Sequence, residues 1–284
     1  MIDVVQITDA IAYHGEGPGW DPAHATLRWV DMLSGDLLSL SVNGSVERRH
    51  MSSVLAAWRP RAAGGVVMAV ERGFATADAN LDEVHELTPL WHHRRIRMND
   101  GGCDPQGRFH CGTMAYDATP GAGRIHRLDP DGSARVVLDG VTVSNGLVWS
   151  RDGTTVYYVD SAVHSIDAFT LDPDDGTFIE RRTVVAIDPA LGTPDGITID
   201  ADGGLWVALW DGAAVHRYTS DGRLDEVLPL PTPRVTACAF GGNDLTDLYI
   251  TTSRFEMTDP DKAAGALFVA KPGINGHPLP QSAI

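Results

Sequence analysis

RMNDGGCDPQGRFHCGTM, residues 97–114, joins a cluster of polar side chains to a tight turn and then to a strand-like run. The polar cluster is Arg97, Asn99 and Asp100, and the turn has the form Asp-Pro-x-Gly at residues 104–107. The proline presets φ in such a turn, and the glycine takes positive φ without steric cost. We therefore expect these polar side chains at the mouth of a strand rather than in its core.

The same frame occurs at three other places in the chain. Each time an oxygen-bearing side chain stands five residues before the turn, and an apolar strand follows about ten residues on. The four side chains are Glu16, Asn99, Asn145 and Asp195, and glycine directly follows all of them except Asn99. One register position shared by four segments indicates a repeat protein.

Strand-like runs set the period of this repeat. They begin at residues 27, 65, 108, 155, 205 and 248, at intervals of roughly 40–50 residues, which is the spacing of propeller blades. Second strands follow them, and residues 125–128 and 215–218 alternate with the period of two of half-buried strands. No sustained helical periodicity is present. We predict an all-β fold, a six-bladed β-propeller that forms a single domain over residues 1–284.

Composition excludes several classes of partner. The chain has 22 Lys and Arg against 38 Asp and Glu, a net charge of −16, and nucleic-acid binding needs clustered positive charge. No apolar run approaches the roughly 20 residues that span a bilayer, and the start of the chain lacks the pattern of a signal peptide. The three cysteines form no paired spacing, which argues against a disulfide framework or a thiolate zinc site. We expect a cytoplasmic protein, monomeric or a weak homo-oligomer, that binds a small molecule rather than nucleic acid or a membrane.

The four recurring side chains suggest a metal site. Equivalent positions of propeller blades converge on the central channel, so Glu16, Asn99, Asn145 and Asp195 are expected to surround one point on the axis. Two carboxylates and two amides suit a hard divalent cation, Ca²⁺ first and Mg²⁺ or Mn²⁺ next, with Zn²⁺ left open. The alternative is that each side chain only caps its own turn, but four in register favour the metal.

Three further roles follow from the same region. Asp195 is a candidate general base beside a bound water, or else a ligand with no proton to move. Arg97 lies two residues from Asn99, so both point to one side of a strand, where Arg97 either binds substrate oxygens or forms an ion pair. Asp117, just past the strand at 108–114, is placed on the same rim. No serine-nucleophile, phosphate-loop or dinucleotide motif is present.

These segments together resemble the senescence marker protein/regucalcin and gluconolactonase family. The resemblance covers most of the chain, and five segments carry it: GEGPGWD at Gly15, RMNDGGCDPQGRFHCGTM at Arg97, SNGLVWS at Ser144, PDGITIDADGGLWVALW at Pro194 and FGGNDLTDLYITTSR at Phe240. It implies a six-bladed propeller of carbohydrate metabolism that hydrolyses sugar lactones with one divalent metal.

The resemblance also implies a role for each site residue. Glu16, Asn145 and Asp195 would be metal ligands, and Asp195 would double as the general base. Arg97, Asn99 and Asp117 would contact the sugar, although relatives carry a longer glutamate at the position of Asp117. The hypothesis is a gluconolactonase-type hydrolase that opens an aldono-lactone to the acid. The alternatives are a calcium-binding propeller without catalysis and a hydrolase of another ester on the same fold.

Overall fold

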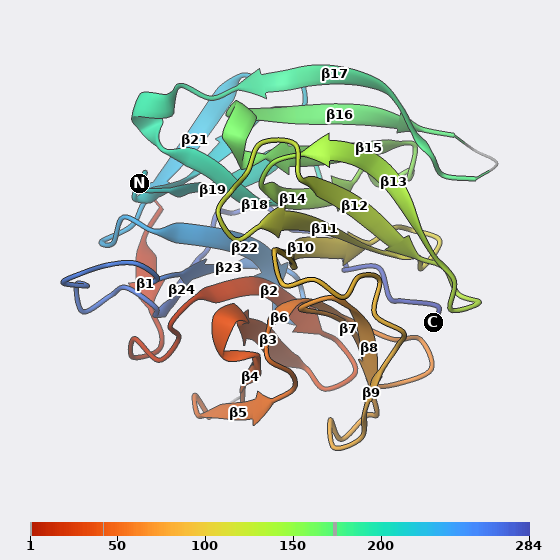
Figure 1. Cartoon of the computed structure of the whole chain (residues 1–284). Helices are drawn as coiled ribbons and strands as arrows, with labels where there is room; N and C mark the ends of the chain where they lie inside the picture. The colour runs from red at the N-terminus through yellow and green to blue at the C-terminus, as the bar shows by residue number, and fades with distance from the viewer. Residues whose placement is uncertain (1, 42, 173–174) are drawn as a thin grey trace.

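Six antiparallel sheets of four strands each make up the protein in the computed structural model, which describes residues 2–41, 43–172 and 175–284 (Figure 1). In chain order the sheets, here called blades one to six, are β2-β3-β4-β5, β6-β7-β8-β9, β10-β11-β12-β13, β14-β15-β16-β17, β18-β19-β20-β21 and β22-β23-β24-β1. The predicted all-β fold, a six-bladed β-propeller, is confirmed.

Each blade contributes strands at the same four depths from the axis. The innermost strands are β2 (Gly15–Asp21), β6 (Leu55–Pro60), β10 (Ile96–Cys103), β14 (Ser144–Trp149), β18 (Thr193–Ile199) and β22 (Val235–Gly241). The second strands are β3 (Thr26–Asp31), β7 (Val66–Val70), β11 (Phe109–Ala115), β15 (Thr155–Asp160), β19 (Leu205–Trp210) and β23 (Asp247–Thr252). The third strands are β4 (Asp36–Leu40), β8 (Gly73–Ala77), β12 (Gly123–Leu128), β16 (Ser165–Leu171), β20 (Ala214–Tyr218) and β24 (Leu267–Ala270). The outermost strands are β5 (Val46–His50), β9 (Val84–Glu86), β13 (Ala134–Val141), β17 (Phe178–Ala186), β21 (Leu224–Pro229) and β1 (Val4–Gln6).

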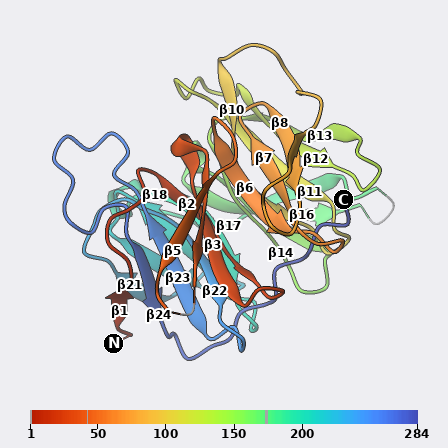
Figure 2. The same cartoon turned by 90° about the horizontal axis from the view of Figure 1, so that it is seen from below.

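The N-terminal strand closes the ring. β1 pairs with β24, with Val4 opposite Ala270 and Gln6 opposite Phe268, so the two ends of the chain complete blade six together (Figures 1 and 2). The innermost strands contact one another in the cyclic order β2, β6, β10, β14, β18, β22 and back to β2. This closed ring sets the geometry of the central channel.

The hydrophobic core is divided into six layers, each between two neighbouring blades. Between blades one and two, for example, the fully buried Trp58 packs with Val30, and its indole nitrogen donates to the Gly17 carbonyl at 3.1 Å. Between blades two and three, Phe74 meets Phe109 edge to face at 5.7 Å between ring centres. Blade orientation is therefore fixed by packing between sheets rather than within them.

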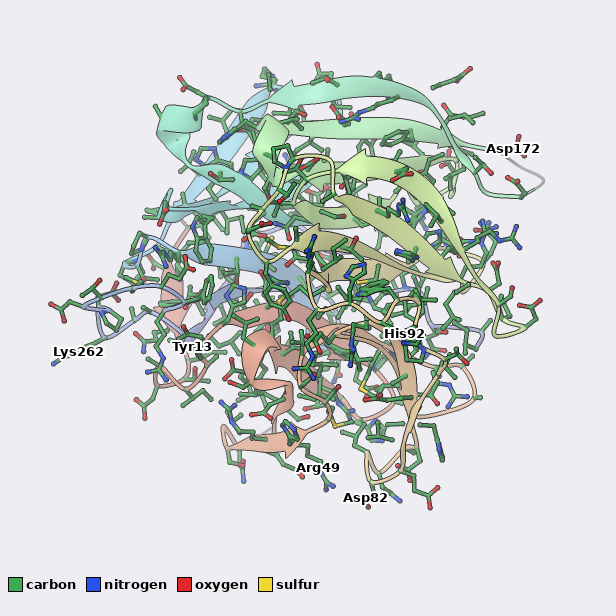
Figure 3. The ribbon with its side chains drawn as sticks, in the orientation of Figure 1. Tyr13, Arg49, Asp82, His92, Asp172 and Lys262 are labelled. Atoms are coloured by element: carbon green, nitrogen blue, oxygen red, sulfur yellow. The ribbon has the colours of Figure 1, made fainter. Side chains whose placement is uncertain are left out.

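Polar contacts add to this packing at the periphery. The Arg49 guanidinium of blade one lies 2.5 Å from the Asp82 carboxylate of blade two (Figure 3). The Asp82 side chain is exposed and the Arg49 side chain is partly exposed, and ion pairs in contact with solvent contribute little stability. Cys103, Cys111 and Cys238 are buried and free, as expected of small core residues.

Helical structure in the described residues consists of three single turns of 3-10 helix: η1 (Met32–Ser34), η2 (Ser161–Val163) and η3 (Pro189–Leu191). None of the helices in this part of the chain has the length and apolar character needed to cross a membrane. The six runs that set the predicted period correspond to the second strands of the six blades.

Candidate functional site

Every innermost strand carries an irregularity at the same place. Register shifts interrupt the pairing of these strands with their neighbours between Glu16 and Gly19, Leu55 and Ala57, Met98 and Gly101, Asn145 and Leu147, Pro194 and Ile197, and Val235 and Ala237. Such bulges turn side chains out of the regular alternation and are common beside functional sites. Here they direct one position of each blade toward the axis.

The glycines that follow Asn145 and Asp195 allow the strands to approach closely there. A Cβ on Gly146 would lie 2.8 Å from the carbonyl oxygen of Asp195, and one on Gly196 would lie 2.5 Å from the Cβ of Ala237. Real Cβ atoms do not come so near, so only glycine fits at these two positions. The close approach brings the residues before them together at the channel.

The four recurring side chains converge as predicted. Glu16, Asn99, Asn145 and Asp195 line one cavity of about 450 Å³ at the entrance of the central channel, and all four are at most 6% exposed. The other lining residues of this site cavity are His14, Arg97, Met114, Val143, Ser161, Ala162, His164, Thr193, Trp210, Asp211 and Phe255. In blades two and six the corresponding positions are occupied by Ala56 and Thr236.

A chain of hydrogen bonds fixes the amide side of the site. The Arg97 guanidinium donates to Asn99 Oδ1 at 2.5 Å, and Asn99 Nδ2 donates to Asn145 Oδ1 at 2.8 Å. Asn145 Nδ2 then donates to Ser161 Oγ at 2.8 Å, and that hydroxyl donates to the Pro194 carbonyl at 2.6 Å. Each amide orientation is thus set by the next residue, and Asn145 Oδ1 keeps a second lone pair free.

The buried carboxylates on the other side of the site repel one another. Burial, and then the nearby Asp100 carboxylate, raise the pKa of Glu16 to about 8. Burial, and then the Glu16 and Asp100 carboxylates, raise the pKa of Asp195 well above its ordinary range. Asp195 Oδ1 is buried and has no hydrogen-bond partner within the described residues. Buried like charges without such partners destabilise the fold unless a proton or a cation offsets them.

Asp100 does not line the site cavity, but its charge acts on Glu16 and Asp195 there. The sequence grouped it with Arg97 and Asn99 without assigning it a role. The bulge between Met98 and Gly101 places it next to Asn99, and burial raises its pKa, while Arg59 on the far side acts to lower it. A regular strand would direct adjacent residues to opposite faces. The glycine pair that follows, Gly101 and Gly102, was the available signal for a bulge here.

Arg97 reaches the site as a cation without a carboxylate partner. It is 6% exposed and, among the described residues, forms no ion pair within 4 Å. Its guanidinium lies 5.8 Å from the centre of the Tyr116 ring, and the Tyr116 hydroxyl donates to Glu71 at 2.9 Å. The ion pair considered from the sequence does not form, so the remaining Arg97 donors are available to a ligand.

An aromatic wall faces this polar cluster, and the recurring sequence frame does not point to it. His14 lies against Trp210 and Phe255, with ring centres 5.9 and 5.3 Å apart, and its Nδ1 is 2.8 Å from Ser253 Oγ. Burial, and then the charge of Arg97, lower the pKa of His14 to about 3. His14 is therefore neutral at working pH and a poor proton acceptor, and nothing in its spacing distinguished it.

Asp117 does not line the site cavity. It is exposed in the turn after β11, where its carboxylate accepts hydrogen bonds from the Thr119 backbone nitrogen at 3.1 Å and the Thr119 hydroxyl at 2.7 Å. These bonds lower its pKa and account for its position, because an Asp side chain readily stabilises its own turn. Its contact with a sugar stays a prediction.

The residues of the site fit a hard divalent cation. Glu16 and Asp195 supply charge, Asp195 Oδ1 is an unpaired buried oxygen, and Asn145 has a free lone pair on its oxygen. In the part of the chain that the structure describes, no group of three or more His, Cys, Asp or Glu is arranged to hold a metal, so amide oxygens have to complete this shell. Such an all-oxygen set favours Ca²⁺ or Mg²⁺ over metals that prefer nitrogen or sulfur.

Comparison with known proteins identifies the family. Residues 14–254 match the family described as the SMP-30/Gluconolactonase/LRE-like region. The chain belongs to this family. It is 34% identical over 98% of both chains to YvrE of Bacillus subtilis, which is assigned as a sugar lactone lactonase, and 32% identical to the pentonolactonase XacC of Haloferax volcanii, over 97% of this chain and 96% of XacC.

A solved structure agrees with the same assignment. The crystal structure of regucalcin from Agrobacterium tumefaciens, described as a calcium-binding protein, superposes with a TM-score of 0.89 at 27% identity, covering 98% of this chain and 96% of that one. The predicted family is therefore confirmed, and the names of these lactonase relatives bear out the predicted enzyme class.

Proposed function

We propose that this family member is a metal-dependent lactonase that hydrolyses a sugar (aldono-) lactone to the open acid in the site cavity, and that residues 1–284 form one propeller domain. The observation that carries the proposal is the convergence of Glu16, Asn145 and Asp195 beside the unpaired guanidinium of Arg97. Acidic oxygens suited to a cation and a buried donor suited to sugar hydroxyls meet in one cavity. The lactonase names of the relatives support the substrate class.

Glu16, Asn145 and Asp195 would hold the cation, with Asn99 beside them. Calcium is the first candidate, since a relative is described as calcium-binding and the donors are all oxygens. When bound, a divalent cation supplies polarisation of an ester carbonyl and stabilisation of the oxyanion that forms on it. The positive charge of the cation would then offset the repulsion between the two buried carboxylates.

Asp195 would act as the general base. Its Oδ1 is buried and has no hydrogen-bond partner among the described residues, so this oxygen is free to accept a proton. It takes a proton from water as the water oxygen bonds to the lactone carbonyl carbon. Collapse of the tetrahedral intermediate breaks the ring C–O bond, and Asp195 returns the proton to the leaving ring oxygen. His14 does not compete for this role, because its pKa is lowered to about 3.

Arg97 and Asn99 would orient the substrate. Both are buried on β10 and tied to each other by a 2.5 Å hydrogen bond, so their donors are held in place before a ligand arrives. Charge-assisted hydrogen bonds from such a guanidinium suit sugar hydroxyls. Trp210 and Phe255 supply the apolar wall of the cavity and would cover one face of the ring and exclude water.

Proton release from aldono-lactones tests the proposal. Chelator-stripped protein is mixed with five- and six-membered aldono-lactones, with and without Ca²⁺, Mg²⁺, Mn²⁺ or Zn²⁺, and the rate is compared with spontaneous hydrolysis. We expect acceleration that depends on the cation and is lost in Asp195→Asn. Folded protein that binds a cation in calorimetry yet accelerates no lactone would instead favour a calcium-binding propeller without catalysis. Turnover of simple aryl esters alone would favour another ester hydrolase.

A further inference from the structure

A second cavity, of about 330 Å³, lies at the other end of the innermost strands. On β10, Asn99 lines the site cavity whereas Gly102 and Cys103 line the second one. On β14, likewise, Asn145 faces the first and Trp149 the second. The two cavities therefore occupy opposite ends of the central channel.

The C-terminal tail forms one wall of this second cavity, which is called the tail cavity below. His277, Pro278, Leu279 and Pro280 line it. Backbone hydrogen bonds hold the tail across the ring. The Gly276 nitrogen donates to the Leu245 carbonyl in blade six at 2.8 Å, and the Ser282 nitrogen donates to the Pro60 carbonyl in blade two at 2.8 Å. The Ala283 nitrogen donates to the Gly107 carbonyl in blade three at 2.9 Å. Figure 2 shows the tail crossing this face of the propeller. The wall is thus a built part of the fold.

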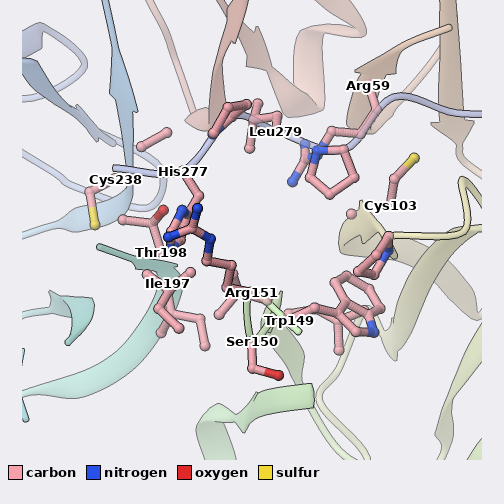
Figure 4. Close-up of a pocket in the computed structure, with 18 of the residues that line it drawn as sticks. Arg59, Cys103, Trp149, Ser150, Arg151, Ile197, Thr198, Cys238, His277 and Leu279 are labelled. Atoms are coloured by element: carbon pink, nitrogen blue, oxygen red, sulfur yellow. The ribbon is translucent and has the colours of Figure 1, made fainter. Parts of the chain in front are cut away.

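All ionisable side chains that line the tail cavity, apart from the Cys103 and Cys238 thiols, are basic ones. They are Arg59, Arg151 and His277, and neither Asp nor Glu is among the described residues that line it. This is unexpected for a chain with 38 acidic and 22 Lys and Arg residues. Figure 4 shows Arg151 beside His277, with Arg59 across the cavity from them. Burial, and then the charge of Arg151, lower the pKa of His277, although Asp200 acts to raise it. The positive charge of the cavity therefore comes from its two arginines. The cavity is therefore complementary to an anion.

Arg59 is the more enclosed of the two arginines. Within the described residues it has no carboxylate within 4 Å, and its guanidinium donates to the carbonyl of the preceding Trp58 at 2.6 Å. A Cβ on Gly102 would lie 3.2 Å from Arg59 Nη2, so the glycine leaves room for the guanidinium. Asp100, the acidic group behind it, acts on Arg59 only through space, and burial lowers the pKa of Arg59. A half-buried, unpaired guanidinium is costly unless an anion joins it.

The rest of the lining is mainly apolar. Leu147, Trp149, Ile197 and Leu279 surround the space between the cations. Apolar walls with a few placed charges are typical of small-molecule sites. Such walls would leave the hydroxyls of a sugar acid without partners, so the cavity does not suit the polyhydroxylated product of the proposed reaction.

We propose that the tail cavity binds a small organic carboxylate with a compact apolar body, its carboxylate paired with Arg59 and its body against Leu147, Trp149 and Leu279. The proposal concerns a second site and does not depend on the proposed lactonase activity. Bidentate pairing of a guanidinium with a carboxylate supplies the recognition of charge. The apolar walls supply the preference for the body.

Calorimetry with four probes tests the two parts separately. Benzoate carries both the charge and the body, benzyl alcohol only the body, inorganic phosphate only the charge, and gluconate a polyhydroxylated body. We expect benzoate to bind at least tenfold more tightly than each of the others. Equal affinity for benzyl alcohol would refute the role of Arg59, and equal affinity for phosphate or gluconate would refute the role of the apolar walls.

Variants and a heavy-atom probe locate the site. Arg59→Met should lower benzoate affinity about tenfold, to that of benzyl alcohol, whereas Arg124→Met, an exposed arginine paired with Asp139 at 2.9 Å, should leave it unchanged. Leu279→Ala should weaken the binding of benzoate and of benzyl alcohol by the same factor. This variant locates the site if Arg59→Met does not fold. Anomalous scattering from 4-bromobenzoate should place bromine among Leu147, Trp149 and Leu279. Bromine elsewhere, or full affinity in Arg59→Met, would overturn the proposal.

Discussion

Replacing Glu16 by glutamine should stabilise the cation-free protein at high pH and abolish its response to calcium. Burial and the Asp100 carboxylate raise the pKa of Glu16 from 4.5 to about 8. Between these values the folded chain holds a proton that the unfolded chain has already released. Unfolding then releases a proton, so the free energy of unfolding of the wild type falls as the pH rises through this window.

The size of the effect follows from the slope of this linkage. One proton changes the free energy of unfolding by about 1.4 kcal/mol per pH unit. With partial titration at both ends, the wild type should lose on the order of 3 kcal/mol relative to Glu16→Gln between pH 5 and pH 8. Calcium that binds only the folded wild type should restore about 2.7 kcal/mol at a hundredfold excess over its dissociation constant.

Urea unfolding, followed by tryptophan fluorescence at pH 5, 6, 7 and 8 with chelator or with calcium, measures both effects. Glu47→Gln is the control, since Glu47 is exposed on β5 and pairs with Arg49, two residues along the same strand, at 2.8 Å. It should follow the wild type at every pH. Parallel pH profiles for the wild type and Glu16→Gln, or a less stable Glu16→Gln at pH 8 without calcium, would refute the buried-charge reasoning.

Three other substitutions test catalysis, and one tests packing. Asp195→Asn should lower kcat for a lactone about 10³-fold, and a loss below tenfold would place the base elsewhere. Arg97→Met should raise KM roughly 10- to 100-fold with a smaller change in kcat, as expected for the loss of a charge-assisted hydrogen bond; an unchanged KM would remove Arg97 from substrate binding. Asp117→Ala, in an exposed turn, should change kcat/KM less than about threefold, so a tenfold rise in KM would establish a sugar contact. Trp58→Ala should lower the free energy of unfolding in urea by about 3–5 kcal/mol, because Trp58 is fully buried between blades one and two; a loss below 1 kcal/mol would contradict that packing.

The blade count could be predicted because each blade repeats its own local pattern. The second strands are short apolar runs, and the turns before them contain Gly, Pro and Asp. The spacing of these strands can therefore be found from the local sequence alone. The positions of Glu16, Asn99, Asn145 and Asp195 follow from the same repeat. A register shared by four blades becomes a position shared in space once the ring closes.

Other parts of the site depend on departures from the repeat. The charge of Asp100 acts on the site from a bulge that interrupts the alternation of β10, and His14, Trp210 and Phe255 approach from separate segments. No regular spacing relates these residues. Asp117 illustrates the opposite case, since sequence position placed it on the rim while bonds to Thr119 hold it in an exposed turn.

The all-β class, the six blades and the four oxygen-bearing positions at the axis could all be predicted from the sequence, because each recurs at a fixed local period. Only the folded chain shows that β1 completes blade six, that Arg97 has no ion pair with any described residue and that the tail encloses a cavity beside Arg59. Two of these features join residues more than two hundred positions apart, and the third depends on whether a carboxylate of another segment comes close to Arg97. They are set by how six interblade layers pack and close, which no local pattern records.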